Sequence, residues 1–247
     1  MSSDNATTSI IGRTRSYYDV GGNAQRIRKA DRPDGGVTVK DYQREIEKLA
    51  RSKGIEKLYH FTPAVNAASI LKNGLASQQL LQAHDIDFYA PDQYRFDDRL
   101  SALSLSIHSI NEALLKKKIA EHGGDWIILE IEASILWTHS CRFCWTNAAS
   151  SEVANYRPFL GGPWGFEEMF KDRPVSAIDL RSQRDTYGKR KNQPTDIQAE
   201  VQVFDPIDSD LIVDLTVKNP RVKREMEALM ERIGERRPVV INEQIFW

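Results

Sequence analysis

Short stretches in which apolar and polar residues alternate recur along this chain, and they constrain its fold more than any other feature. Alternation with a period of two is typical of β-strands that bury one face. The chain has more such stretches than regular strand–helix–strand crossovers need, so we expect an α+β fold built on a split, curved, mostly antiparallel sheet with flanking helices. The expected strands are residues 57–61, 101–107, 126–132, 198–204, 211–215 and 239–247.

Capping and stop signals between these stretches predict the helices. Asp41, Thr62 and Ser109 are expected to cap the first three, and Glu112 completes a capping box with Ser109. Glycine follows each of these helices, and Pro220 opens the last one. The expected helices are residues 41–53, 63–73, 110–122 and 220–233.

The length of 247 residues suits one domain, which we place at residues 37–247 behind a polar, basic N-terminal arm at residues 1–36. The arm is expected either to be a solvated tail or to help hold a nucleic acid. The formal net charge is −1, so binding to nucleic acid must come from local patches. The sequence contains no signal-peptide pattern and no apolar run of membrane length, so we expect a cytoplasmic protein.

The strand expected at residues 198–204 carries the strongest chemical signal. Alternation places Gln198, Glu200 and Gln202 on one face and small apolar residues on the other. Glu200 is then either an exposed carboxylate on an edge strand or a carboxylate held over a cleft. The preceding loop, residues 181–191, has five cations and one carboxylate, a composition typical of contacts with phosphodiesters. Its candidate nucleic-acid contacts are Arg181, Arg184, Tyr187, Lys189, Arg190 and Lys191.

Two other turns are expected to present side chains to a ligand. The strand–turn–helix unit at residues 57–74 brings His60, Thr62 and Asn66 near a helix N-terminus, where backbone amides favour a phosphate or a carboxamide oxygen. The loop at residues 161–165 exposes Trp164 between glycines and a proline. That indole is expected either to stack on a nucleic-acid base or to pack as a plug.

Several other kinds of site lack their signatures. Cys141, Cys144 and His139 have the spacing of part of a zinc site, but no second Cys/His pair completes it, so we expect two buried thiols and no metal. A zinc deaminase needs a His-x-Glu motif, which none of the five histidines provides. Phosphate-binding glycine loops and the nucleophile elbow of serine hydrolases are also absent from the sequence.

The remaining set suits glycosyl transfer from NAD. Departure of nicotinamide leaves an oxocarbenium-like ribose, which a carboxylate can stabilise. The same carboxylate can orient a ribose hydroxyl and take a proton from the acceptor nitrogen. An arginine would hold the pyrophosphate through paired hydrogen bonds.

Three motifs, in this order, resemble the DarT family, the toxins that ADP-ribosylate bases of single-stranded DNA with NAD as donor. They are Tyr59-His60-Phe61-Thr62 with Asn66 and Asn73-Gly74-Leu75, then Trp145-Thr146-Asn147, then Gln198-Ala199-Glu200-Val201. The likeness spans residues 57–217 and implies an ADP-ribosyltransferase fold with Glu200 as the catalytic glutamate. By the same resemblance Arg95 or Arg99 is the catalytic arginine, with Arg95 preferred. The donor site implied is His60, Thr62, Asn66, Leu75, Ser104, Trp145, Thr146 and Asn147.

Two departures from the family pattern refine this expectation. Pro63 stands where many members have a second histidine, and residues 104–107 replace the aromatic strand of the thymidine-modifying branch. The second departure resembles the guanine-modifying DarT1 branch, so we expect guanine as the acceptor. The resemblance also implies a role in phage defence and a cognate antitoxin, a macrodomain or related hydrolase that removes the mark. Two alternatives stay open, namely an RNA or protein acceptor and a non-catalytic nucleic-acid-binding module.

Overall fold

The computed structural model describes residues 40–89 and 100–247. The expected N-terminal arm and both candidate arginines, Arg95 and Arg99, lie outside these ranges. The strands are β1 Lys57–Pro63, β2 Leu103–Ile107, β3 Trp126–Glu132, β4 Cys141–Cys144, β5 Glu200–Val203, β6 Ile212–Val217 and β7 Val239–Ile241. The α-helices are α1 Asp41–Lys53, α2 Ala67–Asn73, α3 Gln78–Ala83, α4 Glu112–His122, α5 Ile135–Thr138, α6 Ser151–Ala154, α7 Pro163–Glu168, α8 Gln183–Thr186 and α9 Pro220–Ile233. The 3₁₀ turns are η2 Ala64–Asn66, η3 Arg157–Phe159, η4 Ser209–Leu211 and η5 Glu243–Phe246.

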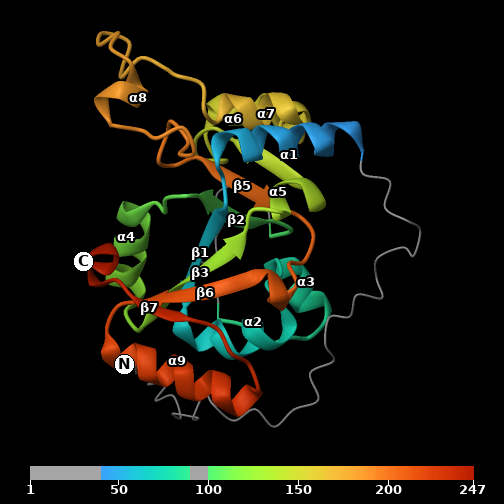
Figure 1. Cartoon of the computed structure of the whole chain (residues 1–247), viewed down its shortest axis with the longest axis vertical. Coiled ribbons are helices and arrows are strands. Elements are labelled where there is room, and N and C mark those ends of the chain that lie inside the picture. Colours follow the sequence, from blue (N-terminus) through green and yellow to red (C-terminus); the bar gives the residue numbers. More distant parts are fainter. Residues whose placement is uncertain (1–39, 90–99) are drawn as a thin grey trace, which may run out of the picture.

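The strands of the described residues form one seven-stranded sheet in the order β4-β5-β2-β1-β3-β6-β7. Every neighbouring pair is antiparallel except β6 and β7, which run parallel. Figure 1 shows α1, α6 and α7 at the β4–β5 end of the molecule and α9 at the other end. The expected α+β fold with a mostly antiparallel sheet is therefore confirmed.

The sheet divides between β1 and β2. Strand β1 pairs with β3 along its whole length, from Lys57 to Pro63, but with β2 only at Leu58 and Tyr59. The first half of β2 pairs with β5 instead, at Leu103 to Leu105. Beyond Tyr59 the backbones of β1 and β2 are no longer paired, so the sheet opens at His60.

Apolar side chains cover both faces of the sheet. On one face, Ile127 and Leu129 of β3 lie in the main core with residues of α1, α2 and α9. On the other, Trp126 and Ile128 pack with Leu115 of α4 and with the C-terminal turn η5. Burial of each large aliphatic side chain contributes about 1.5–3 kcal/mol to the free energy of folding. A strand covered on both faces needs apolar residues on both, and this is why the apolar run 126–132 indicated an interior strand.

Several helix ends follow the expected signals, but none of the three expected N-caps does. Gly54 ends α1 in the left-handed conformation, with φ 67°, and Asn219 caps α9 through a 3.1 Å bond from the amide of Val222. The expected caps Asp41 and Ser109 are wrong. Helix α1 is preceded by Lys40, and α4 is capped by Asn111, whose Oδ1 accepts from the Leu114 amide at 3.0 Å. Asn111 acts as the cap because its side-chain oxygen reaches the amide of Leu114, the third residue of the helix.

Four other boundaries differ from expectation. Thr62 and Pro63 do not open a helix, because both still pair with β3 as the end of β1. The segment after His139 contains an unexpected strand, β4, and the loop expected at 161–165 begins helix α7 at Pro163. The last strand stops at Ile241, and a 3₁₀ turn follows it. These short elements depend on contacts with distant parts of the chain more than on local pattern.

The turn at Gly74 ends α2 and allows the residue that follows, Leu75, to pair with Ile207. Gly74 has a φ of 89°, and a Cβ atom added there would lie 2.4 Å from the carbonyl oxygen of Ile207. Leu75 then exchanges two 2.9 Å backbone hydrogen bonds with Ile207. Only glycine fits this close approach. Across residues 40–89 and 100–247, no helix is long and apolar enough to cross a bilayer.

Candidate active site

Glu200 begins β5, a strand that lies between β4 and β2, so it is not on an edge strand. Its side chain is half-buried, and Oε1 accepts a 2.7 Å hydrogen bond from the backbone amide of Ala148. A backbone amide fixes the direction of a carboxylate without adding a formal positive charge beside it. Of the two interpretations open at the sequence level, the structure favours a held carboxylate over an exposed one.

The loop that supplies this amide contains the second motif, Trp145 to Asn147. Cys144 lies opposite Glu200 in the β4–β5 pair, so the chain leaves β4 directly beside the carboxylate. Asn147 builds the turn, since its Oδ1 accepts from the amide of Ala149 and its carbonyl accepts from the amide of Ser150, both at 2.8 Å. Two motifs that lie 52 residues apart in the chain therefore meet at one point.

His60 lies where the sheet opens. Its Nδ1 is 3.0 Å from the backbone carbonyl of Ser104 on β2, so the imidazole spans the two strands beyond their last backbone pair. Ser104 lies opposite Gln202 on β5, two residues from Glu200. With adjacent strands about 4.8 Å apart, the backbones of His60 and Glu200 are on the order of 10–15 Å apart. The two predicted residues therefore lie on strands that are separated in the sheet by β2 alone.

Thr62 and Asn66 form a brace rather than an open pair of ligands. The Asn66 amide nitrogen donates to Thr62 Oγ1 at 3.0 Å and to the carbonyl of Tyr89 at 2.9 Å. In return, Asn66 Oδ1 accepts from the backbone amide of Tyr89 at 2.9 Å. These two hydrogen bonds to the Tyr89 backbone resemble those between paired strands, and they hold Tyr89 against the start of α2. Thr62 is buried, with 6% of its surface exposed.

Leu75 belongs to the main core instead of an open surface. It is 4% exposed and is joined to Ile207 through the paired backbone bonds described above. Its contribution to the site is therefore the position of the chain that follows α2, and the structure does not place its side chain on a ligand surface.

Trp145 and Trp164 pack together beside this loop. Trp145 is buried, and its ring centroid lies 5.9 Å from that of Trp164 and 5.4 Å from that of Tyr156, both in edge-on arrangements. Trp164 nevertheless keeps 43% of its surface exposed. The two roles considered for Trp164, packing and exposure, therefore occur in the same side chain.

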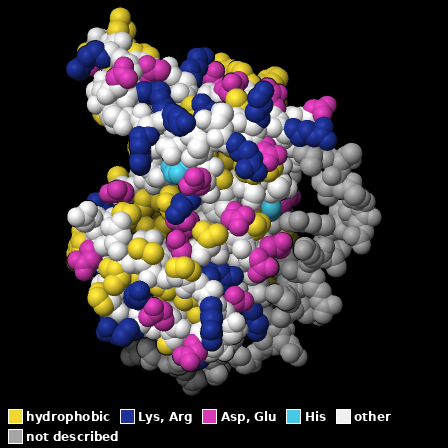
Figure 2. All heavy atoms as spheres, in the orientation of Figure 1, with side chains coloured by type: hydrophobic (Ala, Val, Ile, Leu, Met, Phe, Trp, Pro, Cys, Tyr) yellow, Lys and Arg dark blue, Asp and Glu magenta, His cyan; other side chains and the backbone are white. Residues whose placement is uncertain are grey.

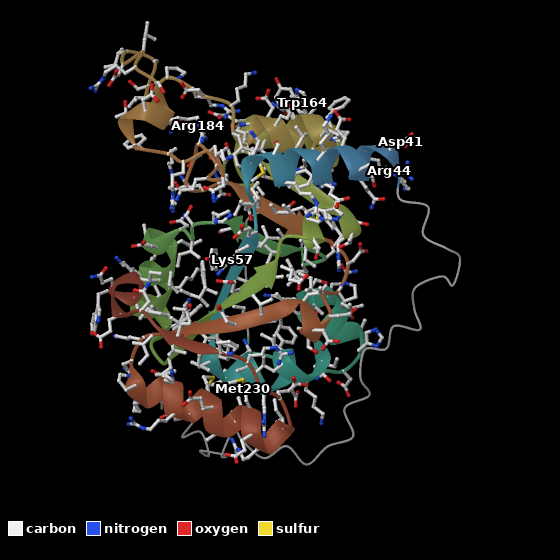
Figure 3. All side chains as sticks on the ribbon, in the orientation of Figure 1. Asp41, Arg44, Lys57, Trp164, Arg184 and Met230 are labelled. Carbon is white, nitrogen blue, oxygen red and sulfur yellow. The ribbon has the colours of Figure 1, made fainter. Side chains whose placement is uncertain are left out.

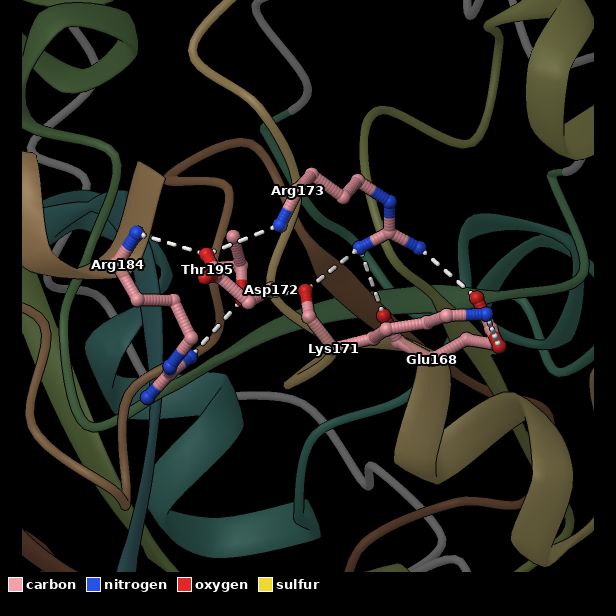
Figure 4. Close-up of polar contacts among 6 residues, drawn as sticks. All are labelled: Glu168, Lys171, Asp172, Arg173, Arg184 and Thr195. Atoms are coloured by element: carbon pink, nitrogen blue, oxygen red, sulfur yellow. Dashed lines mark hydrogen bonds and ion pairs between the residues drawn. The ribbon is translucent and has the colours of Figure 1, made fainter. Parts of the chain in front are cut away.

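The basic loop projects from the body of the protein around α8, as Figure 1 shows. Arg184, an expected nucleic-acid contact, instead ties the base of this projection together. Its guanidinium donates to the carbonyls of Gln193 and Arg190 and to Thr195 Oγ1, at 2.8–3.0 Å. A neighbouring anchor joins Arg173 to Glu168 at 3.0 Å, and Figure 4 shows both. Because those acceptors satisfy Arg184, we assign it a structural role.

The other predicted cations of the loop differ in availability. Arg181 forms a 2.6 Å ion pair with Asp179, which raises the pKa of the arginine, and Lys191 Nζ lies 3.5 Å from the carbonyl of Ser52 at the end of α1. Burial lowers the pKa of Lys189, whereas Arg190 and Tyr187 are exposed. Figure 2 shows Lys and Arg side chains on this projection with Asp and Glu among them.

The cysteines behave as a small part of the core. Cys144 is buried, and Cys141 is partly buried with its thiol directed at the carbonyl of Ile135, at 3.4 Å. Burial raises the pKa of the Cys141 thiol well above its usual range. Within the described part of the chain, no group of three or more His, Cys, Asp or Glu side chains is arranged to hold a metal ion.

A polar cluster on β1, β3 and β6 has no counterpart in the sequence analysis. Lys57 pairs with Glu130 at 2.5 Å. Burial raises the pKa of both Tyr59 and Asp214, and the charge of Glu130 also acts on Tyr59, raising its pKa further. Glu130 interrupts the apolar run 126–131, and that interruption was the only sequence signal of the cluster.

Comparisons with known proteins identify the family of the chain. Residues 59–247 match the family model described as "ssDNA thymidine ADP-ribosyltransferase, DarT". Curated protein sequences give no match. The solved structure of Thermosipho africanus DarTG in complex with ADP-ribose has a TM-score of 0.52 and 18% identity; the match covers 77% of this chain and 50% of that one. This chain therefore spans about half the length of the Thermosipho protein.

Two structures of DarT from Thermus sp. 2.9 are also similar. The complex with NAD+ has a TM-score of 0.48 and 16% identity, and the complex with ADP-ribosylated ssDNA has a TM-score of 0.48 and 17% identity. Each match covers 77% of this chain, and 97% and 96% of the Thermus chains. The likeness to the Thermosipho structure concerns the fold, whereas the family model matches most of the sequence. The chain therefore belongs to the DarT family, the NAD-dependent ADP-ribosyltransferases of single-stranded DNA.

Proposed function

We propose that this protein transfers ADP-ribose from NAD to guanine in single-stranded DNA and that Glu200 is its catalytic carboxylate. The observation that carries the proposal is the 2.7 Å bond from the Ala148 amide to Glu200 Oε1, which joins Glu200 of the third motif to the residue that directly follows the second. A carboxylate fixed in this way is positioned before substrate arrives. Preorganised charge of this kind is usually the largest contribution to stabilisation of a charged transition state.

The reaction needs one bond to break and one to form. The bond between ribose C1′ and the nicotinamide nitrogen breaks, and its electron pair leaves with nicotinamide. The ribose then carries positive charge, which the negative charge of Glu200 stabilises. An acceptor nitrogen of the base bonds to C1′, and the proton that it loses passes to the Glu200 carboxylate.

The opening between β1 and β2 supports NAD as the donor. His60 bridges this opening to Ser104 on β2, and Glu200 lies on β5, the next strand along the sheet. We propose that His60 and Ser104 contact the donor and that Thr62 and Asn66 hold the turn beside it. By family resemblance, Arg95 or Arg99 would bind the pyrophosphate, with Arg95 as the first choice.

The choice of base depends on β2. The family description names thymidine, yet β2 of this chain presents Ser104 and Ser106 between buried Leu103, Leu105 and Ile107. This serine-bearing strand stands in place of the aromatic strand expected in the thymidine-modifying branch. We therefore favour guanine.

The loop at residues 181–191 and the indole of Trp164 are proposed to meet the DNA strand. Exposed Arg190 and Tyr187 are the best placed for phosphate and base contacts, respectively. Arg181, Lys189 and Lys191 would contribute after partial release from their present neighbours. Arg184 is left out of this set because it binds the loop itself.

We also propose an antitoxin partner that removes the modification. One structural relative is DarTG, and the present chain spans half of that protein. A macrodomain or related ADP-ribosyl hydrolase is the chemistry that such a partner would need. Restoration of the unmodified oligonucleotide mass on addition of a macrodomain hydrolase would support this proposal.

The test of the activity is an intact-mass assay. The protein is incubated with NAD and single strands that contain guanine or thymine as the only variable base, and with an RNA strand of the same sequence. We expect the guanine strand to gain the mass of one ADP-ribose. Gain on thymine alone would overturn the base assignment, gain on RNA alone would overturn the DNA acceptor, and gain on no strand would overturn the enzymatic proposal.

A matched pair of variants assigns the catalytic residue. Glu200→Gln keeps the size and hydrogen-bonding ability of the side chain, whereas Glu227→Gln changes an exposed carboxylate on α9. Transfer is expected to fail only in the first variant. Equal activity of the two variants would contradict the role of Glu200.

A further inference from the structure

Three exposed aromatic side chains lie together beside the loop after β4, which supplies the Ala148 amide to Glu200. Tyr156 is 46% exposed, Phe159 is 65% exposed and Trp164 is 43% exposed, and together they line an open cavity of about 340 Å³. We name Tyr156, Phe159 and Trp164 the aromatic platform. Figure 3 labels Trp164 on α7, at the β4–β5 end of the molecule. Large apolar side chains of a monomer seldom gather on its surface without a partner.

Two of the three rings of the platform are held by contacts with other aromatic rings. The rings of Tyr156 and Trp164 lie 5.8 Å apart, and both rest on the edge of buried Trp145. Gly165 fixes α7 behind them, because a Cβ atom added there would lie 2.7 Å from the carbonyl oxygen of Leu160. Rings held in this way lose little conformational freedom when a ligand stacks on them.

The platform is also connected to the catalytic carboxylate. Trp145 directly follows Cys144, which lies opposite Glu200, and the same loop supplies the amide that holds Glu200. Paired residues on neighbouring strands are about 5 Å apart, so the platform begins roughly 10–20 Å from the reacting centre. A few nucleotides of a single strand span that distance.

The chemistry around the platform favours a base over a phosphate. Its lining is aromatic, and of the charged residues nearby in the chain, Glu152 and Glu167 are on α6 and α7 and half-exposed Arg157 begins η3, directly after Tyr156. Arg173 lies over the ring of Trp145 at 5.6 Å, which places a cation behind the aromatic cluster. Flat π surfaces stack on any unpaired base, and each such contact strengthens binding appreciably.

We propose that the aromatic platform is a DNA subsite that stacks an unpaired base neighbouring the base to be modified. This inference rests on the proposed function, because it assumes a single-stranded DNA acceptor at Glu200. The platform would position the strand and set its affinity, whereas the chemistry would stay with Glu200.

The experiment uses the full chain and steady-state kinetics with oligonucleotides. Phe159→Ala and Trp164→Ala are each expected to raise the KM for the strand by about five- to a hundredfold, with a much smaller change in kcat. Trp164→Phe keeps an aromatic face and should recover most of the loss. The matched control is Trp247→Ala, which removes another exposed indole, 72% exposed, far from this loop in sequence.

Abasic substitutions in the strand identify the contact. With the wild-type protein, an abasic site at the stacked position should raise the KM by about the same factor as Trp164→Ala does. With the Trp164→Ala protein, the same abasic site should raise the KM no further. The proposal would be overturned if abasic sites raised the KM by the same factor for the wild type and for Trp164→Ala at every position. An unchanged KM in folded Phe159→Ala and Trp164→Ala would also overturn it.

Two other results are distinguishable from these. Absence of ADP-ribosylation by the wild type on every strand would instead refute the proposed function. Platform variants that lose binding to an antitoxin while keeping the wild-type KM would show a protein-binding surface, and would overturn the DNA subsite. Melting temperatures of all variants establish which of them are folded before the kinetics are compared.

Discussion

The two halves of the sheet use their acidic side chains in opposite ways. In the half made by β1, β3 and β6, Glu130 is 7% exposed and is neutralised by Lys57 at 2.5 Å. In the half made by β2, β5 and β4, Glu200 begins its strand, is half-buried and is oriented by a backbone amide. A carboxylate with a neighbouring lysine stabilises the fold, whereas one held by an amide at a strand end can act on a ligand.

Pairing between strands differs in the same sense. β1 and β3 pair over their full lengths, whereas β1 and β2 separate after Tyr59. In the fully paired half, six of the seven residues of the interior strand β3 are buried. Between β1 and β2, the backbone pairing ends before His60. The donor site that we propose lies where the backbone pairing between β1 and β2 ends.

The largest expected effect is on catalysis. Glu200→Gln should reduce the rate of ADP-ribosyl transfer by about 10²–10⁴-fold, because it removes the charge that stabilises the ribose and the group that accepts the proton. The melting temperature should change by less than about 2 °C, since Gln can still accept the Ala148 hydrogen bond. Single-turnover kinetics and calorimetry check the two results, and a large loss of stability would break the comparison.

The next effect is on stability. Leu129→Ala in β3 should lower the free energy of unfolding by about 2–5 kcal/mol, because Leu129 is fully buried and truncation leaves a cavity. Chemical denaturation measures this loss. Per folded molecule, the transfer rate should remain near that of the wild type, and a selective loss of turnover in the folded fraction would show that the two halves are not separable.

A smaller effect is expected at the buried ion pair. Glu130→Gln should lower stability by about 1–2 kcal/mol, since it leaves the ammonium of Lys57 without its partner; the exposure of Lys57, 42% of its side chain, limits the loss. Thermal unfolding of Glu130→Gln beside Glu200→Gln gives the direct contrast. If Glu130→Gln abolished transfer and kept its stability, the assignment of the two carboxylates would have to be exchanged.

The smallest effect concerns pH. Burial, with the charge of Glu130 second, raises the pKa of Asp214, so ionising Asp214 opposes folding as pH rises above the ordinary carboxyl range. Asp214→Asn removes this opposition and should raise the melting temperature by about 1–3 °C at pH 7. Below about pH 3, where Asp214 is mostly protonated in both the folded and the unfolded state, the advantage should disappear. An advantage that grows on acidification has the wrong sign for this explanation.

The sequence indicated the elements whose signals are local. Strand β3 was expected at residues 126–132 because its run is the most apolar of the strand candidates, and α9 because Pro220 opens an amphipathic stretch. The alternation in β2 also held, with Leu103, Leu105 and Ile107 buried. These features depend on period and caps, which a single sequence contains.

The features that escaped depend on contacts between distant residues. Strand β4 has four residues without alternation and exists through its pairing with β5. The hydrogen bonds between Asn66 and Tyr89 join residues that are 23 positions apart in the chain, and neither residue type predicts this contact. Arg184 was expected to meet DNA because cations usually face solvent, but loop carbonyls surround it. Composition indicates charge, and it does not indicate which acceptors the fold will bring to that charge.

The central claim is that Glu200 faces the nicotinamide riboside of a donor bound at the opening between β1 and β2. A crystal structure with a non-hydrolysable NAD analogue tests it most directly. The result that we predict has a ribose hydroxyl about 2.6–3.2 Å from the Glu200 carboxylate, with His60 and Ser104 beside the same ligand. An analogue bound elsewhere, with the Glu200 carboxylate directed into solvent, would contradict the account.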